Sequence, residues 1–333
     1  MALLTDLPNE LLHEIMVIAS DDGFHHKRLK KFALVNKQLR TVAFPLLVRL
    51  WNNYYGKPKL GLLALHLLRY PQHRSQLRTL IFQNYYADKG SQSPSGYRAT
   101  FYQTLPHRPE ILNELAEEAK RTLPDLAESS EGWIDRIRQG QVGAILALIL
   151  AWATSLTTVY LYFRGIYESA DKDLVGRCLS RQTRVRFVSC CIGYFLPLPR
   201  NMESFAPDTF VSILPGSLET CHLDWLMRHV ISQHLEARPD SRYNKGQAHS
   251  CIMKAIYVLL QEAGPGRKFS KLRNIDFSLL GINVWSRPTL DKAVEELNKV
   301  VELAKSRGVE LDYYDYTDKE YRTTAVRVST CDT

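Results

Sequence analysis

The side chains best suited to chemistry in this sequence belong to its cysteines, its histidines and one glycine-rich basic segment. The cysteines follow no metal-binding or redox spacing; they occupy positions 178, 190, 191, 221, 251 and 331. His25 and His26 are adjacent, and three histidines follow Cys221 without the spacing of a metal site, at 222, 229 and 234. The segment AGPGRK (263–268) could cradle a phosphate, but it lies between a predicted helix and a predicted strand, where a turn is required.

These residues do not form a recognisable active-site pattern. The sequence lacks the dinucleotide-binding, Walker, nucleophile-elbow, C-x-x-C and H-E-x-x-H motifs. Cys190 and Cys191 are neighbours and would point to opposite faces of a strand, so buried thiols of a reducing compartment are a better interpretation than a disulfide framework. We therefore expect a non-enzymatic chain with no cofactor and no metal, located in the cytoplasm, the nucleus or both. An enzyme with an unrecognised site is a distant alternative.

A binding function would depend first on the segment DLPNELLHEI (6–15). Pro8 suits the first turn of a helix because it needs no hydrogen-bond donor there, and Glu10 complements the positive helix end. Apolar residues then recur every three or four positions, at Leu11, Leu12, Ile15, Met16, Ile18 and Ala19. This wide apolar surface must be covered by the following helices or by a partner.

Two more short helices follow. The first is predicted over Leu29–Val35, and the second after the N-cap residue Asn36, with Pro45 interrupting it. Three short helices within about fifty residues bury little surface. Apolar surface left exposed on such a unit usually marks a binding site.

Residues 3–51 resemble an F-box of the type common in fungal proteins. The resemblance rests on LPNELLHEI and FALVNKQLRTVAFPLL (32–47), with matches at Leu4, Leu7, Pro8, Glu10, Leu11, Leu12, Ile15, Leu29, Leu34, Val35, Asn36, Leu39, Val42, Pro45 and Leu47. It implies binding of a Skp-type adaptor, and through it of a cullin ubiquitin ligase. The implied adaptor contacts are Leu7, Pro8, Leu11, Leu12, Ile15, Val35 and Leu39.

One segment departs from the family pattern. The linker 21–31 has Gly23-Phe24 where many members carry an acidic-leucine pair before the second helix. The alternative interpretation of residues 1–51 is a helical cap on a larger domain, with the same leucines in its core.

The charge distribution bears on the partner. The 333-residue chain has a net charge of +8, and residues 24–51 contain no Asp or Glu. Their basic residues are Lys27, Arg28, Lys30, Lys31, Lys37, Arg40 and Arg49. Such a patch can steer an acidic protein, such as a Skp-type adaptor, or be a solvated helix face. Few aromatic residues interleave with it, which argues against nucleic-acid binding.

The rest of the chain alternates helical segments with short strands. Four strands align as L-x-x-L-x-L variants, at Leu77/Leu80/Phe82, Leu156/Val159/Leu161, Leu218/Cys221/Leu223 and Leu272/Ile275/Phe277. This pattern resembles degenerate leucine-rich repeats, with irregular spacing and another strand-like run at 184–192. Helices are expected over 60–70, 109–123, 133–153, 249–264 and 290–308, the last closed by Gly308.

The expected fold is therefore mixed α/β, with a three-helix F-box (1–51) followed by an irregular leucine-rich-repeat-like solenoid (52–314). A loop insertion is expected around 84–132 and a flexible tail over 315–333. A two-layer α/β domain without solenoid stacking is the alternative. The uncharged run 142–163 could span a bilayer by length, but its central Thr and Ser residues favour a buried helix followed by a strand, so no membrane association is expected.

Two functions are compatible with this organisation. One is a substrate-recognition adaptor of a Skp–cullin–F-box (SCF) ubiquitin ligase, in which the C-terminal region binds a protein target. The other is an interaction scaffold that keeps an F-box-like fold but acts outside a ubiquitin ligase. Neither the target nor its binding surface can be identified from the sequence.

Overall fold

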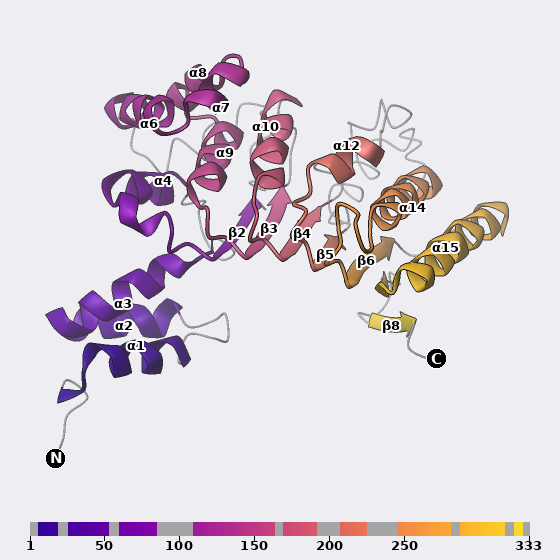
Figure 1. The fold of residues 1–333 in the computed structure, drawn as a ribbon, viewed down its shortest axis with the longest axis horizontal. Helices are drawn as coiled ribbons and strands as arrows, with labels where there is room; N and C mark the ends of the chain where they lie inside the picture. The colour runs from indigo at the N-terminus through magenta and orange to yellow at the C-terminus, as the bar shows by residue number, and fades with distance from the viewer. Residues whose placement is uncertain are drawn as a thin grey trace, which may run out of the picture.

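The protein is described here from a computed structural model. The structure describes residues 6–18, 26–52, 60–84, 109–163, 169–191, 207–224, 245–280, 287–316 and 323–328. Figure 1 shows a group of helices near the N-terminus, followed by a sheet whose helices lie along one side. The expectation of a mixed α/β fold is confirmed.

The sheet orders its eight strands as they occur in the chain. The first seven are parallel, and the eighth is antiparallel to the seventh. The strands are β1 (Leu50–Asn52), β2 (Thr79–Asn84), β3 (Thr158–Phe163), β4 (Phe187–Cys191), β5 (Thr220–Asp224), β6 (Asn274–Leu280), β7 (Glu310–Tyr316) and β8 (Thr323–Val328). Each parallel strand therefore joins the edge left by the one before it.

The strand register agrees with the alignment made from the sequence. Leu80 pairs with Val159, and Phe82 with Leu161. Further along the sheet, Cys221 pairs with Ile275. Because residues in register share one face of a parallel sheet, the aligned apolar positions form continuous rows toward the helices.

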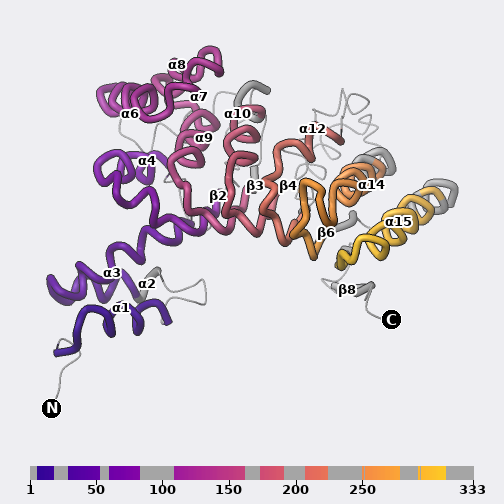
Figure 2. The backbone as a smooth tube through the Cα atoms, viewed as in Figure 1, coloured from indigo at the N-terminus to yellow at the C-terminus, as the bar shows by residue number. Residues whose placement is uncertain are grey.

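Helices cover this face along the length of the sheet (Figure 1). They are α4 (Leu60–Arg69), α9 (Val142–Trp152), α10 (Ser169–Ser180), α12 (Pro207–Ser212), α14 (Lys245–Gln261) and α15 (Arg287–Arg307), with a short 3-10 turn at Pro71–His73. Figure 2 follows the chain as it passes back and forth between this helix layer and the sheet. Parallel strands need such crossovers, because each strand ends at the edge of the sheet opposite to the one where the next strand begins.

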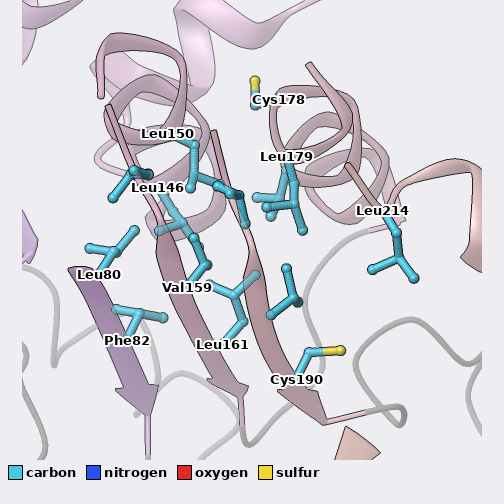
Figure 3. Packing of buried hydrophobic residues seen from close by; sticks show 14 of the residues in the cluster. Leu80, Phe82, Leu146, Leu150, Val159, Leu161, Cys178, Leu179, Cys190 and Leu214 are labelled. Carbon is cyan, nitrogen blue, oxygen red and sulfur yellow. The ribbon is translucent and has the colours of Figure 1, made fainter. Parts of the chain in front are cut away.

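The main core lies between the helices and the sheet. Figure 3 shows Leu146 and Leu150 of α9 and Leu179 of α10 above Val159 and Leu161 of β3. All five side chains are fully buried. Burial on this scale explains why α9 is apolar on every side: Gly143 to Leu150 are all buried.

The run 142–163 is a buried helix followed by a strand, as predicted. It forms α9 and β3, separated by a turn at 153–157. Across the ranges listed above, no helix combines the length and apolar character needed to cross a bilayer.

The helix predicted over 133–153 is instead two helices, α8 (Trp133–Arg138) and α9. Gly140 separates them, with φ +69°, a conformation that favours glycine. The indole Nε1 of Trp133 donates to the carbonyl oxygen of Ala144 at 3.1 Å, so α8 folds back against α9. Helix α10 was not predicted, although Leu174, Val175 and Leu179 are buried in it.

The expected insertion contains ordered helices. Its segment 109–123 forms α6 (Pro109–Thr122), as predicted, and the expected connector 123–132 contains α7 (Pro124–Ser129). Leu115 and Leu126 join the main core from these helices. Residues 85–108 lie outside the described residues.

Two boundaries differ from expectation. The segment 315–333 was expected to be a flexible tail, but Thr323–Val328 pair with β7 as β8. The expected F-box boundary at residue 51 falls inside β1, which follows helix α3 (Lys37–Arg49) directly. Sequence reasoning missed β8 because its stability depends on an existing strand edge.

Candidate functional site

The N-terminal helices form a unit with its own core. Helices α1 (Asn9–Ile18) and α2 (His26–Val35) pack against α3, and their buried residues make a cluster separate from the main core. The cluster consists of Leu12, Met16, Leu29, Leu39, Val42, Ala43 and Leu46. Such a unit can present a surface without depending on the sheet for its packing.

Helix α1 divides its apolar residues between two faces. It begins at Asn9, one residue later than predicted, with the amide of Leu12 donating to the carbonyl oxygen of Pro8 at 3.1 Å. Leu12 and Met16 point into the unit and are 1% exposed, whereas Leu11 is 47% exposed and Ile15 40%. Ile18, 77% exposed, continues the outer face. The helix therefore exposes an apolar stripe that its own chain, as described, does not cover.

The junction between α2 and α3 exposes a second pair of apolar side chains. Leu34 is 85% exposed and Val35 66%. Asn36 ends α2 and caps α3, as predicted: its side-chain oxygen accepts from the amide of Leu39 at 2.7 Å. The cap fixes the chain direction at this point, so Leu39 enters the core while Leu34 and Val35 remain outside.

The start of α1 lies beside this junction. The side-chain amide of Gln38 donates to the carbonyl oxygen of Leu7 at 3.3 Å and to Oδ1 of Asn9 at 3.2 Å. Because Gln38 is three residues after Val35, these bonds bring Leu7 and Pro8 near the exposed end of α2.

The predicted contact residues thus divide into two groups. Pro8, Leu11, Ile15 and Val35 are exposed, and Leu7 is half-buried against the small core. Leu12 and Leu39 are buried in that core and can support the surface without forming it. Exposed Leu34 and Ile18 were not among the predicted contacts. Only packing distinguishes the buried residues from the exposed ones, because core and surface leucines look alike in sequence.

Helix α3 does not break at Pro45, contrary to expectation. Proline removes a backbone hydrogen bond inside a helix, yet α3 continues from Lys37 to Arg49. Val42, Ala43 and Leu46 around it are buried, and this packing holds the helix through the proline. The uninterrupted helix connects the three-helix unit directly to β1.

The basic patch predicted from the sequence lies on this unit. The side chains of Lys30, Lys31, Lys37, Arg40 and Arg49 are exposed. Those of Lys27 and Arg28 fall outside what the structure describes. Within the described part of the chain, Lys30, Lys31 and Lys37 form no ion pair.

The glycine-rich segment 263–268 forms a turn, as predicted, and Gly264 and Gly266 have positive φ. Its basic side chains, Arg267 and Lys268, donate hydrogen bonds to backbone carbonyl oxygens. The Lys268 ammonium donates to the carbonyl oxygens of Val211 at 2.9 Å and Ser212 at 3.0 Å, at the end of α12. Burial lowers the pKa of Lys268. These contacts give Lys268 a structural role.

Buried cysteines fit the sequence interpretation. Cys178, Cys190 and Cys221 are buried in the core as thiols, not as disulfides. Burial raises the pKa of Cys178 to about 12 and raises that of Cys221 as well. Both thiols therefore stay protonated at neutral pH and are poor nucleophiles.

The histidines near Cys221 do not gather into a metal site where they are described. His222 lies on the sheet face away from the helices, with Nδ1 3.7 Å from Oδ2 of Asp276. His229, His234 and His25 lie outside the described residues. Among the side chains that the structure describes, no group of three His, Cys, Asp or Glu could hold a metal ion.

The sheet face away from the helices is polar on one half and aromatic on the other. In register across the strands lie Ile81, Tyr160, Ser189, His222, Asp276 and Asp312. Tyr160 contacts Phe187, with ring centroids 5.1 Å apart. At the other end of the row, the side-chain amide Nδ2 of Asn274 donates to Oδ1 of Asp276 at 3.2 Å.

Comparisons with known proteins do not add an assignment. No family model matches the chain, and neither the curated proteins nor the solved structures include a match. The exposed surfaces of the three-helix unit and of the sheet are therefore the features that bear on function.

Proposed function

We propose that this protein is a non-catalytic substrate-recognition adaptor of an SCF ubiquitin ligase. Its three-helix unit is the F-box that binds a Skp-type adaptor, and its α/β region, an irregular leucine-rich-repeat-like solenoid, binds a protein target. The observation that carries the proposal is the exposed apolar side chains of the three-helix unit, which are Leu11, Ile15 and Ile18 on α1 and Leu34 and Val35 at the junction of α2 and α3.

The energetics favour a partner on this surface. Fully burying a Leu, Ile or Val side chain contributes about 1.5–3 kcal/mol. The five residues are 40–85% exposed, so a partner that covers them gains a substantial part of that contribution from each. Apolar patches of this kind on soluble proteins usually mark interaction sites.

The connection between the unit and the sheet supports a positional mechanism. Helix α3 leads into β1 without a linker, and the amide of Arg78 donates to the carbonyl oxygen of Arg49 at 2.9 Å. A target bound to the α/β region would be held in a constant relation to the adaptor. Such positioning raises the effective concentration of the target near a ligase and requires no chemistry in this chain.

The α/β region supports target binding by its topology. Seven parallel strands follow one another in chain order, and their aligned apolar residues face the helices. This arrangement is typical of solenoids, in which each unit buries its apolar face against its neighbours. The opposite sheet face carries half-buried side chains in register, among them Tyr160, His222 and Asp276, and we propose that a protein target binds along it.

The direct test is co-purification of the full chain with a Skp-type adaptor. Leu11→Asp and Ile15→Asp place a charge in the apolar stripe, and both should abolish binding. Val294→Asp is the matched control, because Val294 is also an exposed helical residue, 46% exposed, but lies far away on α15. Circular dichroism must show that each variant keeps its helices.

The possible results separate the functions. Binding by the wild type and by Val294→Asp, with loss in the folded stripe variants, supports the adaptor function. If the folded wild type does not bind, the adaptor function is refuted and an interaction scaffold outside a ubiquitin ligase becomes the better interpretation. Unchanged affinity in the folded stripe variants refutes the contact surface.

A further inference from the structure

We infer that the partner of the three-helix unit presents an acidic segment to the junction of α2 and α3, where lysines surround two exposed apolar side chains. The surface consists of Lys30, Lys31, Leu34, Val35 and Lys37, and we name it the lysine–apolar surface. The inference deepens the proposed function and rests on it, because it specifies the chemistry of the adaptor at this surface.

Helix geometry brings these side chains together. Residues four apart lie one above the other on a helix, so Lys30 neighbours Leu34 and Lys31 neighbours Val35. Lys37 follows Val35 by two residues, at the start of α3. All five side chains are exposed.

No acidic side chain on α2 or α3 neutralises the positive charge of this surface. Residues 24–51 contain no Asp or Glu. The lysine ammonium groups form no ion pair with any side chain that the structure describes, whereas many basic residues of the α/β region do, as Arg138 does with Glu117 at 2.8 Å. Charge complementarity therefore favours an acidic occupant.

The apolar pair indicates which class of acidic molecule fits. Nucleic acid offers phosphates but no apolar complement to Leu34 and Val35, and stacking on bases would need exposed aromatic rings. The aromatic residues described on this unit, Phe32 and Phe44, are half-buried. An anionic bilayer would need a larger apolar face than two side chains. A protein segment with carboxylates around a small apolar contact matches both features.

The two surfaces of the unit should contribute differently to binding. The apolar stripe on α1 is desolvated in the complex, so it mainly sets the dissociation rate. Exposed lysines attract the partner at a distance, so they mainly set the association rate. The lysine–apolar surface can therefore be tested without removing the apolar stripe.

The experiment measures the association rate of the full chain with a Skp-type adaptor. We expect the triple variant Lys30→Glu/Lys31→Glu/Lys37→Glu to associate at least about 10-fold more slowly than wild type at about 0.1 M salt. The difference should nearly disappear at about 1 M salt, where the Debye length falls from about 10 Å to about 3 Å. Circular dichroism checks that the variant is folded.

A matched control keeps the overall charge equal. Lys254→Glu/Lys271→Glu/Lys292→Glu reverses three exposed lysines of the α/β region and should associate close to the wild-type rate. Equal slowing in both triple variants would assign the effect to net charge and refute the inference.

Other results overturn the inference in distinguishable ways. If the first triple variant associates like wild type while Leu11→Asp abolishes binding, the inference fails and the proposed function stands. If wild type does not bind the adaptor at all, both fail. If wild type but not the triple variant binds phosphatidylserine vesicles or duplex DNA, and the adaptor rate is unchanged, the occupant is not an acidic protein.

Discussion

Truncation of the adjacent residues Leu11 and Leu12 to Ala should lower the stability of the three-helix unit by very different amounts. Leu12 is 1% exposed in the small core, whereas Leu11 is 47% exposed beside it. Replacing a buried Leu by Ala costs about 2–5 kcal/mol, because a cavity adds to the lost burial. Replacing a half-exposed Leu should cost about 1 kcal/mol or less.

The size of the unit makes this difference decisive. Its helices run from residue 9 to residue 49. At about 0.05–0.15 kcal/mol per residue, the unit has about 2–6 kcal/mol of stability in total. Leu12→Ala should therefore open the three helices in a large fraction of molecules, while Leu11→Ala leaves them folded and weakens only adaptor binding.

Hydrogen exchange measured by mass spectrometry separates the two effects. Peptides from α1 to α3 should lose protection in Leu12→Ala and keep it in Leu11→Ala. Peptides from α9 provide the internal control, because that helix belongs to the main core. Wild-type protection of the three helices in Leu12→Ala, or equal loss in both variants, would refute the division of α1 into a core face and a binding face.

Three further predictions concern the α/β region and its junction. A Cβ at Gly176 would lie 2.5 Å from Cγ2 of Ile213, so Gly176→Ala should lower the free energy of unfolding by about 1–3 kcal/mol in urea titrations, and Ile213→Ala in the same chain should recover part of it. Gly308 ends α15 with φ +66° in open space, so Gly308→Ala should cost about 1–2 kcal/mol by backbone strain alone, measured by thermal denaturation. Nε2 of His66 lies 2.8 Å from Nδ1 of His73; burial lowers the pKa of both rings, and the neighbouring His73 lowers that of His66 further. The folded state thus binds protons less readily than the unfolded chain, so the melting temperature should fall as pH drops below about 6.5, with a smaller fall in His73→Gln; a pH-independent melting temperature would contradict this.

The sequence alone determined the features that depend on local spacing. The apolar positions of the strands predicted the pairing of Leu80 with Val159, because alternation assigns side chains to faces. Asn36 and Gly308 predicted the start of one helix and the end of another, since a cap depends on one side chain and a C′ glycine on one backbone angle.

Only the tertiary structure decided which apolar residues form the core and which form a surface. Leu11 and Leu12 are the same residue type, and their roles separate because α1 packs on α3 along one face. Pro45 remains helical and β8 forms for a similar reason: packing across the unit and an available strand edge outweigh local preference. Contacts between residues distant in the chain supply free energy that local sequence patterns do not contain.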